Sequence, residues 1–257
     1  MLLAVDIGNT NILFALYHNE SFNQVWRVQT RKDQTEDEYA ASLRQLFASN
    51  NLDFKDVSAI IISSVVPIAT QNIKRLCEKY FQLNPFIIDP TETDFGLDIK
   101  LDKPHEVGAD RIVNSVAAAK EVEPPFIVID FGTATTFDVV TKEGYVGGAI
   151  APGINLSIKA LKDAAAKLPD IELERPSSAL GNDTVSAMQS GVFWGYTGLI
   201  NTILSKLKEE LDQNVSIVAT GGLARFFEND ITGLTLVDEN LTLKGLVEIY
   251  KRSKSNE

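Results

Sequence analysis

Residues 126–136 read FIVIDFGTATT, and residues 2–10 read LLAVDIGNT. Both stretches share one plan: a short apolar run, an aspartate, one apolar residue, a glycine, and then hydroxyl or amide residues. The second aspartate, Asp130, follows the first, Asp6, by 124 positions. An internal repeat of this kind predicts two similar halves. In each half the apolar run predicts a buried strand that ends in a tight glycine turn.

Strand and helix patterns follow both turns in a similar order. Apolar runs predict further strands at 12–17, 25–29, 59–63, 86–88, 136–141, 145–150 and 215–220. A capping pattern at Thr35 and a proline at Pro67 predict helices, the second reaching about Tyr80, and a long helical stretch covers 183–210. The sequence therefore predicts an α/β protein with halves at 1–120 and 121–257. The polar tail from Lys251 is expected to fray.

The composition excludes several classes of protein. A net charge of −11 and a pI near 4.8 oppose general binding to a phosphate backbone, so we expect no nucleic-acid partner. Cys77 is the only cysteine, which excludes an intrachain disulfide. No apolar run approaches the roughly 20 residues of a membrane-spanning helix, and the N-terminus lacks a basic leader. We expect a cytoplasmic protein that does not enter a membrane.

The two repeated turns carry the first candidate site. A carboxylate at the end of a buried strand, followed by glycine and a hydroxyl or amide residue, offers an acidic anchor to a hydrated metal and backbone N–H donors to phosphate. Asp6 and Asp130 both fit this description. A single such turn is more simply an ordinary corner with a local hydrogen bond. The second copy shifts the preference to a shared nucleotide site. The phosphate-binding patterns G-x-x-x-x-G-K-[ST] and G-x-G-x-x-G after a strand are absent from the sequence.

A second candidate lies between the halves, at Gly108-Ala109-Asp110-Arg111 before an apolar helical pattern. The carboxylate of Asp110 is able to accept a proton from an attacking alcohol, and the guanidinium of Arg111 to bind a carboxylate or phosphate. The alternative is a solvated helix start, with Asp110 favoured by the helix dipole. On this motif alone the alternative is preferred. Thr184, after Gly181-Asn182-Asp183, is likewise explained by helix capping.

Taken together, the motifs resemble those of the type III pantothenate kinase family over nearly the whole chain. The matching stretches are 6–11 (DIGNTN), 108–111 (GADR), 130–136 (DFGTATT) and 147–153 (GGAIAPG), with 181–184 (GNDT) and 220–222 (TGG) downstream. The resemblance implies the duplicated ribonuclease-H-like fold of the acetate and sugar kinase, heat-shock ATPase and actin superfamily. It also implies ATP-dependent phosphorylation of pantothenate, the first step of coenzyme A synthesis.

The resemblance also implies roles for individual residues. ATP would be bound, with Mg²⁺, by Thr133 and by the N-terminal turn, which comprises Asp6, Ile7, Gly8, Asn9, Thr10, Asn11, Ile12 and Leu13. Asp130 would bind K⁺ or NH₄⁺. Asp110 would be the proton acceptor, and pantothenate would be held by Gly108, Ala109, Asp110, Arg111 and Thr184. Family members are homodimers whose substrate pocket borders the subunit interface.

The sequence departs from the family pattern at three positions. Leu101 stands where many members carry a pocket tyrosine, His105 where serine is common, and Leu13 where some relatives have lysine. Two alternative functions stay open at this stage. One is a superfamily kinase with a different acceptor. The other is a non-catalytic regulator like the Bvg accessory factors, against which the intact Asp6, Asp110 and Asp130 argue.

Overall fold

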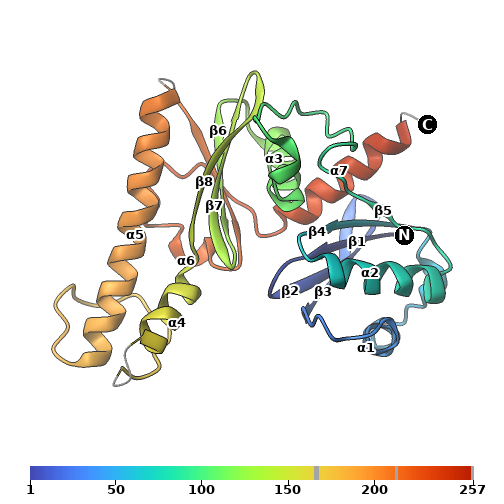
Figure 1. Cartoon of the computed structure of the whole chain (residues 1–257), viewed down its shortest axis with the longest axis horizontal. Helices are drawn as coiled ribbons and strands as arrows, with labels where there is room; N and C mark the ends of the chain where they lie inside the picture. The colour runs from blue at the N-terminus through green and yellow to red at the C-terminus, as the bar shows by residue number, and fades with distance from the viewer. Residues whose placement is uncertain (165–167, 212–213, 256–257) are drawn as a thin grey trace. The chain divides into compact units, whose positions relative to one another are not determined.

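The computed structural model describes residues 1–164, 168–211 and 214–255, which form two compact units. The first unit contains residues 1–118 and the C-terminal segment from Leu241, and the second contains residues 119–240 (Figure 1). This division differs from the halves drawn from the sequence, which placed all of 121–257 in the second half. The difference is helix α7 (Leu241–Ser255), whose buried apolar side chains pack with the first unit: Leu241, Leu243, Leu246, Val247 and Ile249.

The first unit is built on a five-stranded mixed sheet with the order β3-β2-β1-β4-β5. The strands are β1 (Leu2–Ile7), β2 (Asn11–His18), β3 (Ser21–Gln29), β4 (Ala59–Ser64) and β5 (Phe86–Ile87). β1, β2 and β3 form an antiparallel meander, as predicted, while β4 and β5 join in parallel. Parallel strands need a crossover, and helices supply it.

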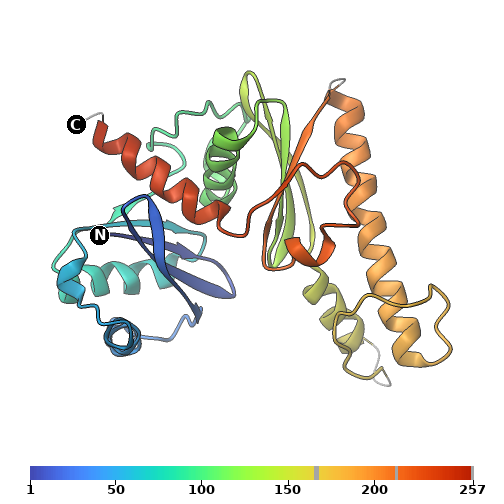
Figure 2. The same ribbon diagram turned by 180° about the vertical axis from the view of Figure 1, so that it is seen from behind.

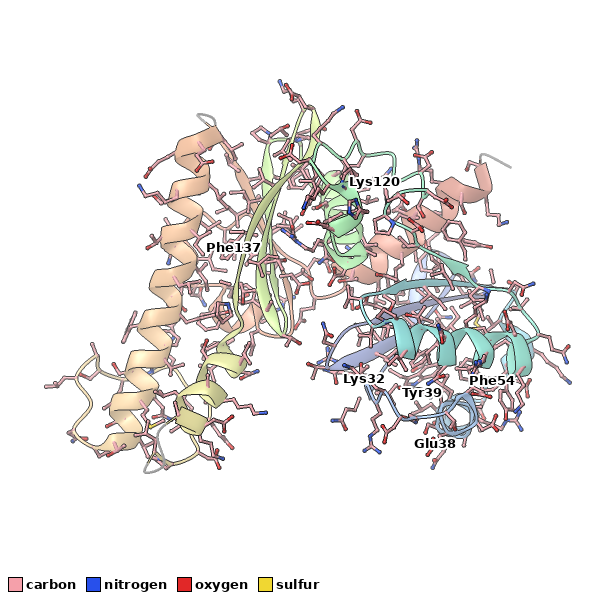
Figure 3. All side chains as sticks on the ribbon, viewed as in Figure 1. Lys32, Glu38, Tyr39, Phe54, Lys120 and Phe137 are labelled. Atoms are coloured by element: carbon pink, nitrogen blue, oxygen red, sulfur yellow. The ribbon has the colours of Figure 1, made fainter. Side chains whose placement is uncertain are left out.

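Helices cover both faces of this sheet. One face buries Leu3, Val5 and Ile7 against α1 (Glu36–Ser49) and α2 (Pro67–Leu76). Tyr39 of α1 is fully buried there, whereas its neighbour Glu38 is exposed (Figure 3). The predicted capping box is confirmed, because Thr35 Oγ1 accepts from the Glu38 N–H and the Glu38 carboxylate accepts from the Thr35 N–H at 2.8 Å.

α7 contacts β1 and β4, and it lies beside α3 (Ala109–Glu121) in Figures 1 and 2. The α3–α7 contact is close, because a Cβ on Gly245 would lie 2.1 Å from Val113 O. Thr242 Oγ1 also donates to Asn114 Oδ1 at 2.7 Å. The C-terminal helix is therefore a packed part of the first unit, and the expectation of a frayed tail from Lys251 is wrong up to Ser255; residues 256–257 lie outside the described residues.

The second unit repeats the sheet. Its order is β10-β9-β6-β7-β8, from strands β6 (Phe126–Phe131), β7 (Ala134–Thr141), β8 (Gly144–Pro152), β9 (Ser216–Gly221) and β10 (Leu236–Val237). The two sheets have the same topology. In each, the first three strands along the chain form an antiparallel meander, and two further strands extend the sheet in parallel from its first strand. The predicted duplication of a ribonuclease-H-like α/β fold is thereby confirmed.

One face of the second sheet carries the core of that unit. Ile127, Ile129 and Phe137 pack against α4 (Ile154–Ala164), α5 (Thr184–Leu211) and α6 (Ala224–Phe227). Phe137 is fully buried in this core (Figure 3). The Thr135 hydroxyl is hydrogen-bonded to Tyr196 of α5, which ties the strand after the second repeated turn to the long helix.

The predicted start of β3 needs correction, whereas the helical stretch from Pro67 reaches Tyr80 as predicted but changes type on the way. β3 begins at Ser21, not at Val25, because Asn19 and Glu20 adopt positive φ values (50° and 60°) and make a two-residue hairpin turn. The helix from Pro67 ends at Leu76, and a π-helical turn from Cys77 to Phe81 then continues it to the left-handed Gln82 (φ 58°).

Candidate active site

The first repeated turn joins β1 to β2 and is held by hydrogen bonds on both sides. The Gly8 N–H donates to Asn11 O at 3.0 Å. Thr30, which follows β3, donates from Oγ1 to Gly8 O at 2.7 Å and from its N–H to Thr10 O at 2.9 Å. Asn9 and Thr10 are exposed at the tip. The result is a fixed loop with a half-buried carboxylate, Asp6, two residues before Gly8.

The second repeated turn, between β6 and β7, is one residue shorter. Ile7 pairs with Ile12 in the first unit, whereas Phe131 pairs with Thr135 in the second. The Gly132 N–H donates to Ala134 O at 3.1 Å, and the Gly153 N–H donates to Thr133 O at 3.2 Å. Thr133 is exposed at the tip. The end of the 147–153 glycine-rich stretch thus supports this turn.

Asp130 lies against the glycine turn after β9. Gly221 has a φ of +90°, and a Cβ at this position would lie 2.5 Å from Asp130 Oδ1 and 2.6 Å from Phe131 N. Any side chain here would therefore displace the carboxylate, in addition to the backbone strain of a positive φ. The Thr220-Gly221-Gly222 stretch, singled out from the sequence, serves in this structure to seat Asp130.

Asp110 is in the first turn of α3. Its Oδ1 accepts from the Arg111 N–H at 2.9 Å. A Cβ on Gly108 would lie 2.5 Å from this same oxygen, so glycine leaves room for the carboxylate to fold back over the helix start. Burial raises the pKa of the Asp110 carboxyl above its usual range, while the Arg111 N–H and guanidinium oppose the rise. A carboxylate with a raised pKa is a better proton acceptor.

Contacts through Val65 connect the start of α3 to the end of β1. The Val65 N–H, just beyond β4, donates to Ile7 O at 3.1 Å, and Val65 Cγ1 would lie 3.5 Å from a Cβ on Gly108. In the first unit, the Asp6 turn and the Gly108–Arg111 segment are therefore both placed beside the chain that leaves β4. Asp130, Thr133 and Thr184 belong to the second unit.

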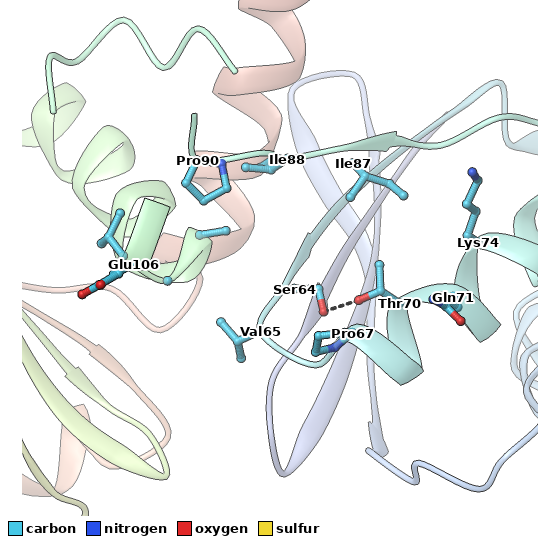
Figure 4. Close-up of a pocket in the computed structure, with 13 residues that line it drawn as sticks. Ser64, Val65, Pro67, Thr70, Gln71, Lys74, Ile87, Ile88, Pro90 and Glu106 are labelled. Atoms are coloured by element: carbon cyan, nitrogen blue, oxygen red, sulfur yellow. Dashed lines mark hydrogen bonds between the residues drawn. The ribbon is translucent and has the colours of Figure 1, made fainter. Parts of the chain in front are cut away.

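A cavity of about 440 Å³ opens beside this segment, within the first unit (Figure 4). Gly108 and Ala109 form part of its wall, Val65, Ile87 and Ile88 make it apolar, and Lys74 and Glu106 are its charged members. Thr70 Oγ1 donates to Ser64 Oγ at 2.6 Å on the same wall. Such a mixture of apolar surface and a few polar groups is typical of a small-molecule site.

The sequence did not reveal most of this wall. Ser64, Val65, Thr70 and Lys74 come from the end of β4 and the first turns of α2, and Pro90 follows β5. One signal was present: Ser63-Ser64 ends an otherwise apolar strand three residues before the helix-starting Pro67. Of the three departures from the family pattern, His105 is exposed and Leu101 is half-buried, while Leu13 lies on β2 opposite Asp6.

Thr184 is the first residue of α5, and the preceding Asp183 caps this helix. Asp183 Oδ1 accepts from the Ser186 N–H at 3.0 Å, and this bond lowers the pKa of the Asp183 carboxyl. The capping interpretation of the 181–184 stretch is thus confirmed. Among the described residues, no group of three or more His, Cys, Asp or Glu side chains is placed to hold a metal ion.

Comparison with known proteins identifies the family. A sequence profile described as type III pantothenate kinase matches residues 2–206. The chain belongs to the type III pantothenate kinase family. It is 50% identical over 256 residues to the type III pantothenate kinase of Paramagnetospirillum magneticum, covering 99% of this chain and 98% of that protein. It is 48% identical over 256 residues to that of Brevibacillus brevis, covering 99% of this chain and all of the other.

Solved structures support the fold of a type III pantothenate kinase. A Campylobacter jejuni protein, described as a conserved putative Baf family transcriptional activator, superimposes with a TM-score of 0.62 at 20% identity, covering 98% of this chain and 99% of that one. A Streptomyces griseus ROK family glucokinase, in complex with glucose and AMPPNP, gives 0.55 at 12% identity, covering 98% and 99%. At these identities the likeness concerns the fold alone.

Family membership makes the chain a kinase. It does not favour the alternative of a non-catalytic regulator like the Bvg accessory factors. The described helices include none long and apolar enough to cross a membrane.

Proposed function

We propose that this kinase transfers the γ-phosphoryl group of ATP to the primary hydroxyl of pantothenate, giving 4′-phosphopantothenate and ADP in the first step of coenzyme A synthesis. Support comes from the family match and from relatives over nearly the full chain that are named type III pantothenate kinase. The observation that carries the proposal is the half-buried Asp110 carboxylate, of raised pKa, beside a cavity walled by Gly108 and Ala109.

In this proposal Asp110 accepts the proton of the attacking hydroxyl. The hydroxyl oxygen forms a bond to the γ-phosphorus as the bond to the β-γ bridging oxygen breaks, and ADP leaves. Phosphoryl transfer needs little covalent chemistry from the protein, so positioning and charge neutralisation provide most of the rate. Gly108, Ala109 and Arg111, with Thr184, hold the acceptor. The apolar wall formed by Val65, Ile87 and Ile88 suits its methyl groups and carbon chain.

The same proposal assigns ATP to the two repeated turns. In the first turn Asp6, Ile7, Gly8, Asn9, Thr10, Asn11, Ile12 and Leu13 line the phosphates, and Thr133 contacts the nucleotide from the second turn. The exposed tips at Asn9, Thr10 and Thr133 offer N–H and hydroxyl donors. The bonds from Thr30 to Gly8 O and Thr10 O fix the first loop before the nucleotide arrives.

The donor set fits the expected cations. Carboxylate, hydroxyl and carbonyl oxygens suit Mg²⁺ and K⁺, and Mg²⁺ in kinases is commonly held by one or two carboxylates together with the substrate phosphates. Asp6 would face the ATP-bound Mg²⁺, and Asp130 would hold K⁺ or NH₄⁺. When bound, these ions neutralise charge on the phosphates.

We also propose a homodimer in the cytoplasm. Six exposed, large apolar side chains lie between residues 150 and 194 of the second unit: Ile150, Leu156, Leu161, Leu180, Val185 and Trp194. Exposed apolar side chains that lie together commonly mark a protein interface, so we infer that the dimer buries these residues. The cytoplasmic location is supported by the single cysteine, Cys77, which is buried and free.

The test is ADP production by the purified protein with ATP, Mg²⁺ and pantothenate, with K⁺ present or replaced by Na⁺. We expect turnover that requires pantothenate and falls when K⁺ is replaced. Turnover with another hydroxyl compound but not with pantothenate would indicate a different acceptor. A folded protein with no turnover under any of these conditions would refute the proposed reaction.

A further inference from the structure

Two buried hydroxyls occupy equivalent places in the two units. Ser63 is 0% exposed and Thr220 is 1% exposed. Their side-chain oxygens have no hydrogen-bond partner among the described residues. Among the described residues the buried hydroxyls without a partner are those of Ser63, Thr197 and Thr220, so finding two of the three at matching positions needs a reason.

Each hydroxyl stands opposite one of the repeated aspartates. Ser63 of β4 pairs in register with Asp6 of β1, and Thr220 of β9 pairs in register with Asp130 of β6. Paired residues of neighbouring parallel strands project from the same face of the sheet, about 4.8 Å apart. The carboxylate is therefore the acceptor that strand pairing places beside each hydroxyl.

The surrounding sequence makes packing a poor explanation for these residues. β4 is otherwise apolar from Ile60 to Ile62, and β9 from Ile217 to Ala219. An apolar residue would fill either position without leaving a buried hydroxyl unsatisfied. The polar group that serine and threonine have in common is the hydroxyl. The hydroxyl is therefore the feature that the two positions share.

We propose that Ser63 and Thr220 are positioning residues, each donating its hydroxyl hydrogen to the carboxylate of Asp6 or Asp130 when the nucleotide and its cations are bound. The inference rests on the proposed function, which places these carboxylates at the phosphate and cation sites. A hydroxyl–carboxylate bond is charge-assisted and fixes which oxygen faces the ligand. Loss of such an outer-shell bond typically weakens ligand binding about 10- to 100-fold.

The test compares Ser63→Ala and Thr220→Val with Thr197→Val. Thr197, in α5, carries another buried unpartnered hydroxyl, so it controls for removal of the group itself. Two quantities are measured on each full-length variant: the unfolding temperature without ligand, and the dissociation constant for Mg²⁺ and a non-hydrolysable ATP analogue by titration calorimetry. Ser63→Thr and Thr220→Ser test whether any hydroxyl suffices.

For Ser63→Ala and Thr220→Val we expect an unfolding temperature equal to or above that of the unmodified protein, and a dissociation constant raised about tenfold. Thr197→Val keeps its affinity, and the two hydroxyl-retaining variants recover it. A lowered unfolding temperature with unchanged affinity would overturn the proposal, because the hydroxyls would then be structural. If the unmodified protein binds no nucleotide, the proposed function itself fails. If the unmodified protein binds and only the variants lose affinity, the proposed function stands and the loss reports on the hydroxyls.

Discussion

Asp110 is the residue on which the proposed reaction depends most. Replacing it by Asn keeps the size of the side chain but removes the proton acceptor, so we expect kcat to fall about 10²- to 10⁴-fold. The fold should be retained, because the buried charge at this position opposes folding more than it supports it. Steady-state kinetics and thermal unfolding of Asp110→Asn measure both effects. Unreduced kcat would exclude Asp110 as the base.

The raised pKa of Asp110 also predicts how activity and stability depend on pH. Catalysis requires the ionised carboxylate, so kcat/KM should rise with pH through the pKa of Asp110 and then level off, at a pH above the usual carboxyl range. Stability should move in the opposite direction. A raised pKa in the folded state contributes stability below the unfolded-state pKa, and this stability is lost as pH rises through the folded-state value.

That pH prediction is checked by kcat/KM profiles together with denaturant unfolding of the unmodified protein and Asp110→Asn. The stability difference between the two proteins should grow in favour of the variant as pH increases across the carboxyl range. An equal difference at every pH would show that Asp110 has the same pKa in the folded and unfolded chains.

At the same scale, the sequence pointed to some residues of the candidate site and gave no sign of others. Asp6 and Asp130 stood out because a repeat makes the same chemistry appear twice. Asp110 was a candidate from its motif, but only the resemblance outweighed the interpretation as a solvated helix start, since the burial of Asp110 and its close approach to Gly108 belong to the folded chain. The cavity wall was missed because its residues come from three segments separated along the chain, at 64–74, 87–90 and 106–109.

At the scale of elements, hydrophobic pattern located the strands because most are buried on both faces or end at glycine. The hydrophobic pattern missed two features, one that depends on local backbone conformation and one that depends on contacts between distant segments. The early start of β3 depends on positive φ values at Asn19 and Glu20, neither of them glycine. The return of α7 to the first unit depends on complementarity between Gly245 and α3, which pattern along one segment does not contain.

The α3–α7 contact provides a prediction with two opposing effects. Ala is favoured over Gly inside a helix by about 1 kcal/mol. At Gly245, however, the added Cβ would lie 2.1 Å from a backbone oxygen, Val113 O, which is unable to move without shifting α3. Overpacking of this kind typically costs about 1–3 kcal/mol, so Gly245→Ala should be destabilising on balance.

Denaturant unfolding of Gly245→Ala tests this balance, with Ser255→Ala as the control because that residue is exposed in the same helix. The control should unfold like the unmodified protein. A stabilised Gly245→Ala would mean that the two helices are not in close contact, and the assignment of α7 to the first unit would lose its physical basis.

At the scale of the whole molecule, the two units share one strand order, and the proposed function gives them different tasks. The first contributes the cavity and Asp110, while the second contributes Asp130, Thr133 and Thr184. The exposed apolar side chains of residues 150–194 are also in the second unit, on β8, α4, the segment before α5, and α5 itself.

The last prediction concerns the interface of the proposed dimer. Gly191, Gly195 and Gly198 of α5 have open space where a Cβ would be placed, and they share this helix with the exposed Trp194. Gly195→Arg should therefore leave the fold of one chain intact, because nothing described lies within 4 Å of the added Cβ. In a subunit interface the same charge would be buried without a partner, which typically costs several kcal/mol.

Size-exclusion chromatography with light scattering and circular dichroism checks this prediction, with Ser49→Arg on the exposed side of α1 as the matched control. We expect the unmodified protein and Ser49→Arg to be dimers, and Gly195→Arg to be a monomer with unchanged helical content. Because Thr184 begins the same helix, the monomer should also show a raised KM for pantothenate if the acceptor pocket borders the interface. A Gly195→Arg protein that remains dimeric would place the interface on another surface. An unmodified protein that is monomeric at all concentrations would contradict the dimer, and the apolar side chains of residues 150–194 would then belong to a contact with a different partner.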